Sequence, residues 1–129
     1  MNEANPYAQI GGESTVRRLC RHFYELMDSV PHFATIRAMH PASLADSREK
    51  LFLFLSGWLG GPDLYLQRVG HPMLRRRHLP FAIGEVERDQ WVACMALAME
   101  MTGIDPAMRE KLLASFFATA DFMRNQPRD

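Results

Sequence analysis

Glycines and prolines divide this chain into segments whose apolar residues recur at helical spacing. The first segment follows Gly11-Gly12 and ends before Pro31, and its apolar stripe consists of Val16, Leu19, Cys20, Phe23 and Met27. Residues spaced by three and four positions share one face of an α-helix. No stretch alternates apolar and polar residues, which is the pattern of a half-buried strand. The sequence therefore predicts an all-α fold.

Three more long helices are expected. The second extends from about 42 to 59 and is ended by Gly60-Gly61-Pro62. The third begins after Gly84, with Gly103 as its C-cap. The fourth begins at Asp105-Pro106, an N-cap residue followed by a proline in the first turn, and extends to about residue 125.

The intervening segments are predicted to be short or irregular. We expect a short helical piece at 33–39, stopped by His40-Pro41. Residues 63–72 show no helical pattern and are predicted to form an extended loop. Residues 73–78 can form at most one or two helical turns, because Pro80 follows.

Length and charge limit the protein classes to consider. The 129 residues suffice for one domain and one hydrophobic core, and the formal net charge is zero, so no general attraction for nucleic acid or anionic membranes is expected. No apolar run approaches the roughly 20 residues of a membrane span, and the first residues do not resemble a signal peptide, so we expect a cytoplasmic protein. Cys20 and Cys94 lie on apolar faces and are predicted to be buried, reduced thiols.

A single histidine stands out in the segment from Arg75 to Phe81. His78 follows three arginines and precedes Leu79-Pro80, and no Cys or His lies at zinc-finger spacing from it. One histidine with a vacant opposite face is how haem iron is held when a diatomic gas must bind. The neighbouring arginines can pair with porphyrin carboxylates. An ordinary half-buried histidine at a helix end is the alternative that this segment alone leaves open.

Across residues 7–123 the chain resembles the truncated haemoglobins, specifically group II. The matching motifs, weak singly but specific in their order, are Ile10-Gly11-Gly12, Phe23-Tyr24, Gly60-Gly61-Pro62 with Tyr65, Gly70-His71-Pro72, Arg77-His78-Leu79-Pro80-Phe81 and Glu87-Arg88-Asp89-Gln90-Trp91. The resemblance implies one truncated-globin domain over 1–129, folded as a two-over-two helical sandwich around haem b, iron protoporphyrin IX. His78 would be the proximal iron ligand.

The resemblance also implies which residues lie on the opposite, distal side of the iron. Tyr24 and Trp91 would donate hydrogen bonds to a gas ligand, since a buried phenol needs a partner and an indole can only donate. His40 stands where many relatives carry tyrosine or phenylalanine; it would join these donors, pack edge-on against the porphyrin, or lie exposed beside Pro41. The remaining distal candidates are Phe23, Ser47 and Leu51.

Two further groups of residues would hold the cofactor. Long basic side chains and one phenol are candidates for the haem propionates: Lys50, Tyr65, Arg76 and Arg77. For the basic residues, full solvation is the competing interpretation, because exposed ion pairs contribute only ~0–1 kcal/mol. The expected apolar pocket walls are Phe54, Leu55, Leu74, Phe81, Ile83 and Met95.

Three functions are compatible with these residues. The first is oxygen binding, for transport or storage of dioxygen and other diatomic gases at a five-coordinate iron. The second is enzymatic, nitric oxide dioxygenation or peroxide turnover, and it needs a reductase partner because the chain has no flavin or nicotinamide motif. The third is a cofactor-free helical interaction module, which would show no Soret band after haem supply. The sequence is compatible with a monomer or a homodimer.

Overall fold

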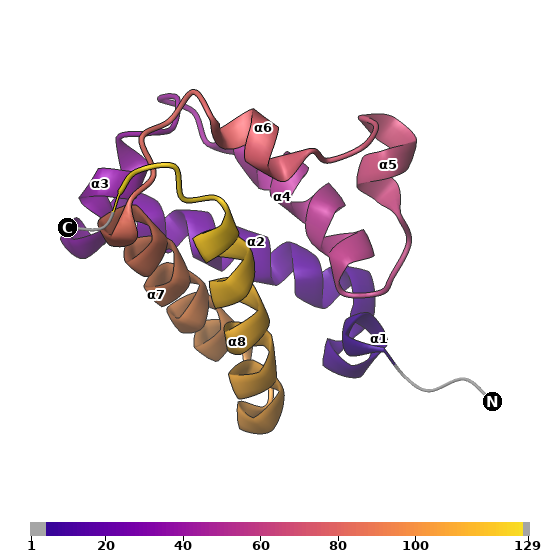
Figure 1. The fold of residues 1–129 in the computed structure, drawn as a ribbon. Coiled ribbons are helices and arrows are strands. Elements are labelled where there is room, and N and C mark those ends of the chain that lie inside the picture. Colours follow the sequence, from indigo (N-terminus) through magenta and orange to yellow (C-terminus); the bar gives the residue numbers. More distant parts are fainter. Residues whose placement is uncertain (1–4, 128–129) are drawn as a thin grey trace.

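The computed structural model describes residues 5–127, and all regular secondary structure in that range is helical (Figure 1). In chain order these are α1 (Pro6–Ile10), α2 (Gly12–Ser29), the 3-10 helix η1 (Pro31–Phe33), α3 (Ala34–Arg37), α4 (Ala45–Trp58), α5 (Leu64–Arg68), α6 (Leu74–His78), α7 (Glu85–Thr102) and α8 (Pro106–Phe122). The prediction of an all-α fold with four long helices is confirmed, and the four are α2, α4, α7 and α8.

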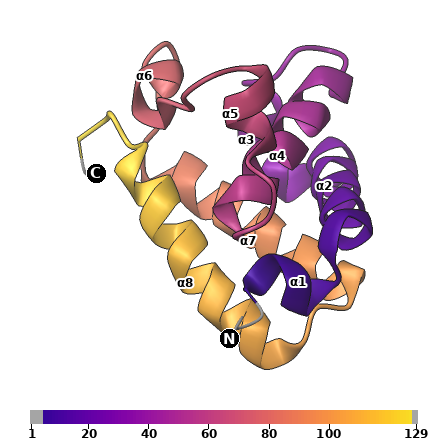
Figure 2. The ribbon, with the colours of Figure 1, turned by 90° about the vertical axis from the view of Figure 1, so that its right-hand side faces the viewer.

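The long helices form two pairs that cross each other. α2 packs against both α4 and α7, and α7 packs against α8 (Figure 1). The expected apolar stripe of α2 lies in the core: Val16, Leu19 and Phe23 are fully buried. α1 lies beside the first half of α8, where it meets the end of α4 (Figure 2). This arrangement is the predicted two-over-two sandwich.

The signals at the ends of the last two long helices act as predicted. Gly103 adopts φ +84°, a left-handed conformation that costs glycine little because it has no Cβ, and it ends α7. A carboxylate oxygen of Asp105 accepts a hydrogen bond from the Ala107 N–H at 3.1 Å, which caps the start of α8. α8 ends at Phe122, three residues before the predicted limit.

One short helix was not predicted, and one prediction about a shorter segment was wrong. Gly11-Gly12 opens α2, the helix with the expected apolar stripe, but the unpredicted α1 precedes it. Asn5 caps α1 through its Oδ1, which accepts from the Ala8 N–H at 2.9 Å. Residues 63–72 are not an extended loop throughout, since Leu64–Arg68 form α5. α5 is stabilised by tertiary packing, because Tyr65 is buried and meets Phe54 edge-to-face at 6.3 Å.

The two cysteines are free thiols in the core, as expected. Burial raises the pKa of Cys20 and of Cys94 to about 12, so neither thiol is ionised near neutral pH. The Cys94 thiol is directed at the Phe23 carbonyl, 3.3 Å away, and so links α7 to α2. Over residues 5–127, no helix is long and apolar enough to cross a membrane.

Candidate functional site

Aromatic rings from four helices form a connected row through the molecule. Phe23 joins the first two contacts of the row: its ring meets Tyr24 edge-on at 4.9 Å and Trp91 at 5.3 Å. Trp91 in turn meets Phe116 at 5.6 Å, and Phe116 stacks on Trp58 at 4.5 Å. The row therefore joins α2, α7, α8 and α4, and it fixes the orientation of the rings that the sequence assigns to the distal side.

Tyr24 and Trp91 retain unused hydrogen-bond donors. Tyr24 is 7% exposed, yet its hydroxyl has no hydrogen-bond partner among residues 5–127, and the same holds for the Trp91 indole N–H. Both atoms keep some solvent exposure. Among the described side chains, the one fully buried N or O atom without a hydrogen bond is His22 Nδ1. Burial first, then the nearby Cys20 and Cys94, raises the pKa of Tyr24 well above its ordinary value. Tyr24 is thus a neutral phenol that can donate.

His40 extends the same cluster from the end of α3. Its ring lies 5.8 Å from the Tyr24 ring, and its Nδ1 lies 2.8 Å from the Ile36 carbonyl oxygen. A carbonyl can only accept, so Nδ1 carries the proton and Nε2 holds the lone pair of a neutral imidazole. Burial lowers the pKa of His40; the Ile36 bond opposes this shift, while the charges of Arg37 and His78 add to it. His40 and His78 are therefore close enough to interact electrostatically.

α4 contributes a half-buried stripe made of Ser47, Leu51, Phe54 and Trp58. Phe54 and Trp58 line a cavity of about 630 Å³ together with Leu74 from α6 and the end of α8. Most of the other lining side chains are apolar: Pro72, Met73, Ala118, Phe122 and Met123. This apolar lining suits part of a flat hydrophobic cofactor, but it includes none of Tyr24, Trp91 and His78.

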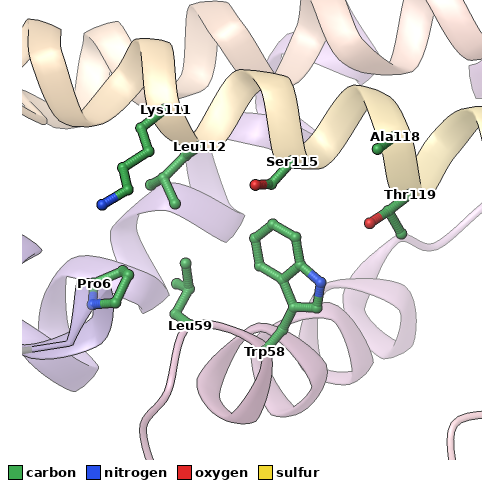
Figure 3. A pocket seen from close by; sticks show the side chains of 8 residues that line it. All are labelled: Pro6, Trp58, Leu59, Lys111, Leu112, Ser115, Ala118 and Thr119. Carbon is green, nitrogen blue, oxygen red and sulfur yellow. The ribbon is translucent and has the colours of Figure 1, made fainter.

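Trp58 separates this cavity from a second hollow on the neighbouring surface. The second hollow, of about 430 Å³, lies between α1, α4 and α8, and Figure 3 shows the Trp58 indole projecting from α4 toward Ser115 and Thr119 of α8. Both hollows share Trp58, Ala118 and Thr119. Lys111 lies at the far end of the second hollow, near Pro6 (Figure 3).

His78 is half-buried at the end of α6. Its Nδ1 lies 2.6 Å from the Leu74 carbonyl oxygen, so Nδ1 donates and Nε2 keeps an unshared lone pair. A neutral imidazole whose second nitrogen is fixed by a backbone carbonyl is the usual form of a histidine metal ligand. The side chain therefore fits the role of an iron ligand.

The four candidates for the propionates differ in their surroundings. The Lys50 side chain is 54% exposed, and its ammonium lies 3.3 Å from the Asp46 carboxylate. Arg76 is exposed and has no ion pair among residues 5–127. Arg77 donates from Nε to the Pro72 carbonyl at 2.7 Å, and its guanidinium lies 5.7 Å from the centre of the Tyr65 ring. The structure thus brings Arg77 and Tyr65 together.

The predicted wall residues fall into three environments. Phe54 and Leu74 line the larger cavity. Leu55 and Met95 are fully buried in the core between the long helices, and Ile83 is buried where the chain enters α7. Phe81 is 40% exposed.

Sequence reasoning missed one polar side chain near His78. Asn125 follows α8 and donates from Nδ2 to the Phe81 carbonyl at 2.7 Å and to the His78 carbonyl at 3.4 Å. An asparagine just after a helix is a signal for a C-cap, and it gives no sign of a partner more than forty residues earlier.

The chain matches the family model described as bacterial-like globin over residues 5–125. It is 40% identical to a group 2 truncated hemoglobin of Bacillus subtilis over 121 residues, which cover 94% of this chain and 89% of that protein. Among solved structures, a group II 2-on-2 hemoglobin from Agrobacterium tumefaciens is 46% identical with a TM-score of 0.93, and the match covers 98% of each chain. A truncated oxygen-avid haemoglobin from Bacillus subtilis is 39% identical with a TM-score of 0.86, over 95% of this chain and 100% of that chain.

Proposed function

The chain belongs to the bacterial-like globins and, within them, to the group II truncated haemoglobins, and on that premise we propose that it binds dioxygen at a five-coordinate haem b iron. Haem and small gaseous ligands are common to this family. The relative from Bacillus subtilis whose structure is described as oxygen-avid supports dioxygen as the gas. We further propose that the protein acts in the cytoplasm.

We assign His78 as the proximal ligand. The bond from Nδ1 to the Leu74 carbonyl fixes the ring and directs the unshared electron pair of Nε2 away from its own helix. This bond is the observation that carries the proposal, because it prepares a neutral imidazole for a metal without using a carboxylate. When bound, haem would supply an iron that could coordinate this imidazole and a small gas molecule.

Tyr24 and Trp91 are proposed as the donors to the gas. Both donors lack partners within the described chain, and Phe23 holds both rings edge-on. Hydrogen bonds in a buried, low-dielectric space are stronger than in water, so two of them slow the escape of a polarised gas ligand. The His40 ring lies edge-on to the Tyr24 ring. Ser47 and Leu51, on the half-buried stripe of α4, are proposed to complete the distal side.

The remaining candidate residues are assigned to the rim and the walls of the haem pocket. Arg77, Tyr65, Arg76 and Lys50 are proposed to meet the propionates, with Arg77 and Tyr65 already in contact. Phe54 and Leu74 are proposed to contact the porphyrin directly. Leu55, Met95, Ile83 and Phe81 support or close the pocket around them.

Absorption spectroscopy tests this proposal. The protein purified after haem supply should show a Soret band, and its ferrous form without gas should have a five-coordinate high-spin spectrum. His78→Ala should lose both features, whereas His71→Ala, which replaces an exposed histidine in the preceding loop, should keep them. A native protein without a Soret band would overturn the haem proposal. A five-coordinate ferrous spectrum in His78→Ala would overturn the assignment of the ligand.

A further inference from the structure

The short helix that carries His78 lacks the apolar anchoring of the other site helices. No residue of α6 is buried, although every long helix buries at least two. Met73, which precedes α6, has φ +47°, an unfavourable conformation for a residue with a side chain. Packing alone therefore does not fix where His78 lies.

Hydrogen bonds from the end of α8 fix this segment. At the start of α6, the Arg75 guanidinium donates to the carbonyls of Phe122 and Arg124 at 2.6 and 2.9 Å. Beyond its end, the Asn125 side chain donates to the carbonyls of Phe81 and His78. Figure 1 shows the chain after α8 turning back toward the start of α7, where these bonds form.

Asn125 uses both ends of its side-chain amide. Its Oδ1 accepts from the Ile83 N–H at 2.9 Å, while Nδ2 makes the two donations described above. The backbone adds a second connection, because the N–H groups of Asn125 and Gln126 both donate to the Ile83 carbonyl, at 2.9 and 3.2 Å. Residues 78–83 are thus bonded at three backbone carbonyls and one N–H to two residues that follow α8.

The end of α8 is itself held firmly. The Asp121 carboxylate accepts from Arg88 of α7 at 2.8 Å and from Arg124 at 2.7 Å. These two guanidinium groups hold the pKa of Asp121 below its ordinary value, so the carboxylate is charged at neutral pH. Because these bonds fix the end of α8 against α7, they also fix the position of Asn125, which follows α8.

We propose that Asn125 is a positioning residue for the proximal ligand: its amide sets the height and tilt of the His78 imidazole by holding the backbone that follows it. This role rests on the proposed function of His78 as the iron ligand. Asn125 does not reach the cofactor in this proposal; it acts through the carbonyls of His78 and Phe81. The bond most affected would be the one from iron to Nε2.

Resonance Raman spectroscopy of the reduced, haem-loaded protein measures that bond through the iron–histidine stretching band. Asn125→Ala should shift this band to lower frequency and broaden it, because the imidazole loses its fixed tilt. Transfer of haem to an excess of an acceptor globin should become about tenfold faster, because the variant loses all three side-chain hydrogen bonds of Asn125. Amide hydrogen exchange over residues 74–83 should also become faster.

Asn125→Asp tests the donor and acceptor roles of the side-chain amide separately. A carboxylate still accepts from the Ile83 N–H but has no hydrogen to donate to the His78 and Phe81 carbonyls. The band should shift as in Asn125→Ala, while the Ile83 amide remains protected from exchange. This variant also keeps the proposal testable if Asn125→Ala does not fold.

Asn5→Ala is the matched control. Asn5 also bonds two backbone groups, donating to the Gly60 carbonyl at 2.7 Å and accepting from Ala8, but it lies at the α1 end of the molecule. It should lower the melting temperature as much as Asn125→Ala while leaving the Raman band and haem transfer as in the native protein.

The outcomes distinguish the two proposals. A native Raman band in both Asn125 variants, or an equal shift in Asn5→Ala, would overturn the positioning role and leave the haem proposal intact. A haem-loaded native protein with no iron–histidine band would instead overturn the assignment of His78. A shift confined to the Asn125 variants supports both.

Discussion

Compared with the aromatic rings around Tyr24, the segment around His78 is exposed and held by a different kind of interaction. Phe23 is fully buried, and Tyr24 and Trp91 both meet its ring edge-on from long helices. α6 buries no residue, and hydrogen bonds to the backbone hold it in place. The Tyr24 side of the candidate site is therefore part of the hydrophobic core. The His78 side is the attached side, because hydrogen bonds hold it to that core.

This difference separates two requirements of a gas-binding site. Donors to a small ligand must keep their places within a few tenths of an ångström, and close packing of long helices provides that. The opposite side must admit a large flat cofactor between α4 and α6, and a short helix without buried residues can move at little cost in apolar contacts.

The largest expected effect is on the attached side. His78→Ala should abolish stable haem retention or leave a weakly bound cofactor with an altered spectrum, because no other side chain of α6 can supply a neutral nitrogen. The measurement is the ratio of Soret to protein absorbance after gel filtration. An undiminished ratio would indicate that His40, the other histidine of the candidate site, supplies the bond.

Truncating an aromatic side chain should lower the free energy of unfolding more in the core around Tyr24 than in the segment around His78. Phe23→Ala should lower the free energy of unfolding by about 3–5 kcal/mol, because a fully buried phenyl ring leaves a cavity. Phe81→Ala, in the attached segment and 40% exposed, should change it by less than about 1 kcal/mol. Denaturant unfolding followed by circular dichroism at equal haem content measures both. Equal losses would contradict the division into core and attachment.

Loss of a single hydrogen-bond donor should change the rate of oxygen release and leave the fold intact. Trp91→Phe should speed oxygen release at least as much as Tyr24→Phe, by about one to two decades, since a hydrogen bond to a charged acceptor contributes ~1.5–3 kcal/mol. The double variant should show less than the sum of the two effects, because both donors are proposed to contact one ligand. Stopped-flow oxygen release measures this. Native rates in both single variants would exclude this pair of donors.

The sequence predicted the packed side of the molecule better than the attached side. Helical spacing located the core positions of α2, and Asp105-Pro106 and Gly103 marked helix ends correctly, because these signals act within one or two turns of the chain. Asn5-Pro6 is the same kind of start signal as Asp105-Pro106, and it would have predicted α1.

Contacts between distant residues could not be predicted in this way. α5 forms because Tyr65 packs against Phe54, and no local pattern indicates that contact. The bonds of Arg75 and Asn125 join residues more than forty positions apart, and they depend on where α8 ends. Lys50 and Arg77 were expected at the rim from their neighbours in sequence; the structure adds their present partners, Asp46 and Pro72.

The smallest expected effect is a pH dependence caused by His40. Burial holds the pKa of His40 below 6.5, so at neutral pH the ring is neutral and donates only to Ile36. Acidification adds a second N–H and a positive charge beside Tyr24, which should slow oxygen release by stabilising a partly negative gas ligand. His40→Phe keeps an aromatic ring against Tyr24 and should lose most of this pH dependence.

The stability of the fold should change with pH through the same group. Because the pKa of His40 is lower in the folded chain, the unfolded chain takes up its proton first as the pH falls below about 6.5. The free energy of unfolding should therefore decrease from pH 6.5 down to the folded pKa, and this slope should be smaller in His40→Phe. Burial is the largest cause of this lowered pKa, and the charges of Arg37 and His78 add to it. If native and His40→Phe protein gave superimposable profiles for both oxygen release and unfolding, the protonation of His40 would affect neither property, and Tyr24 would act without it.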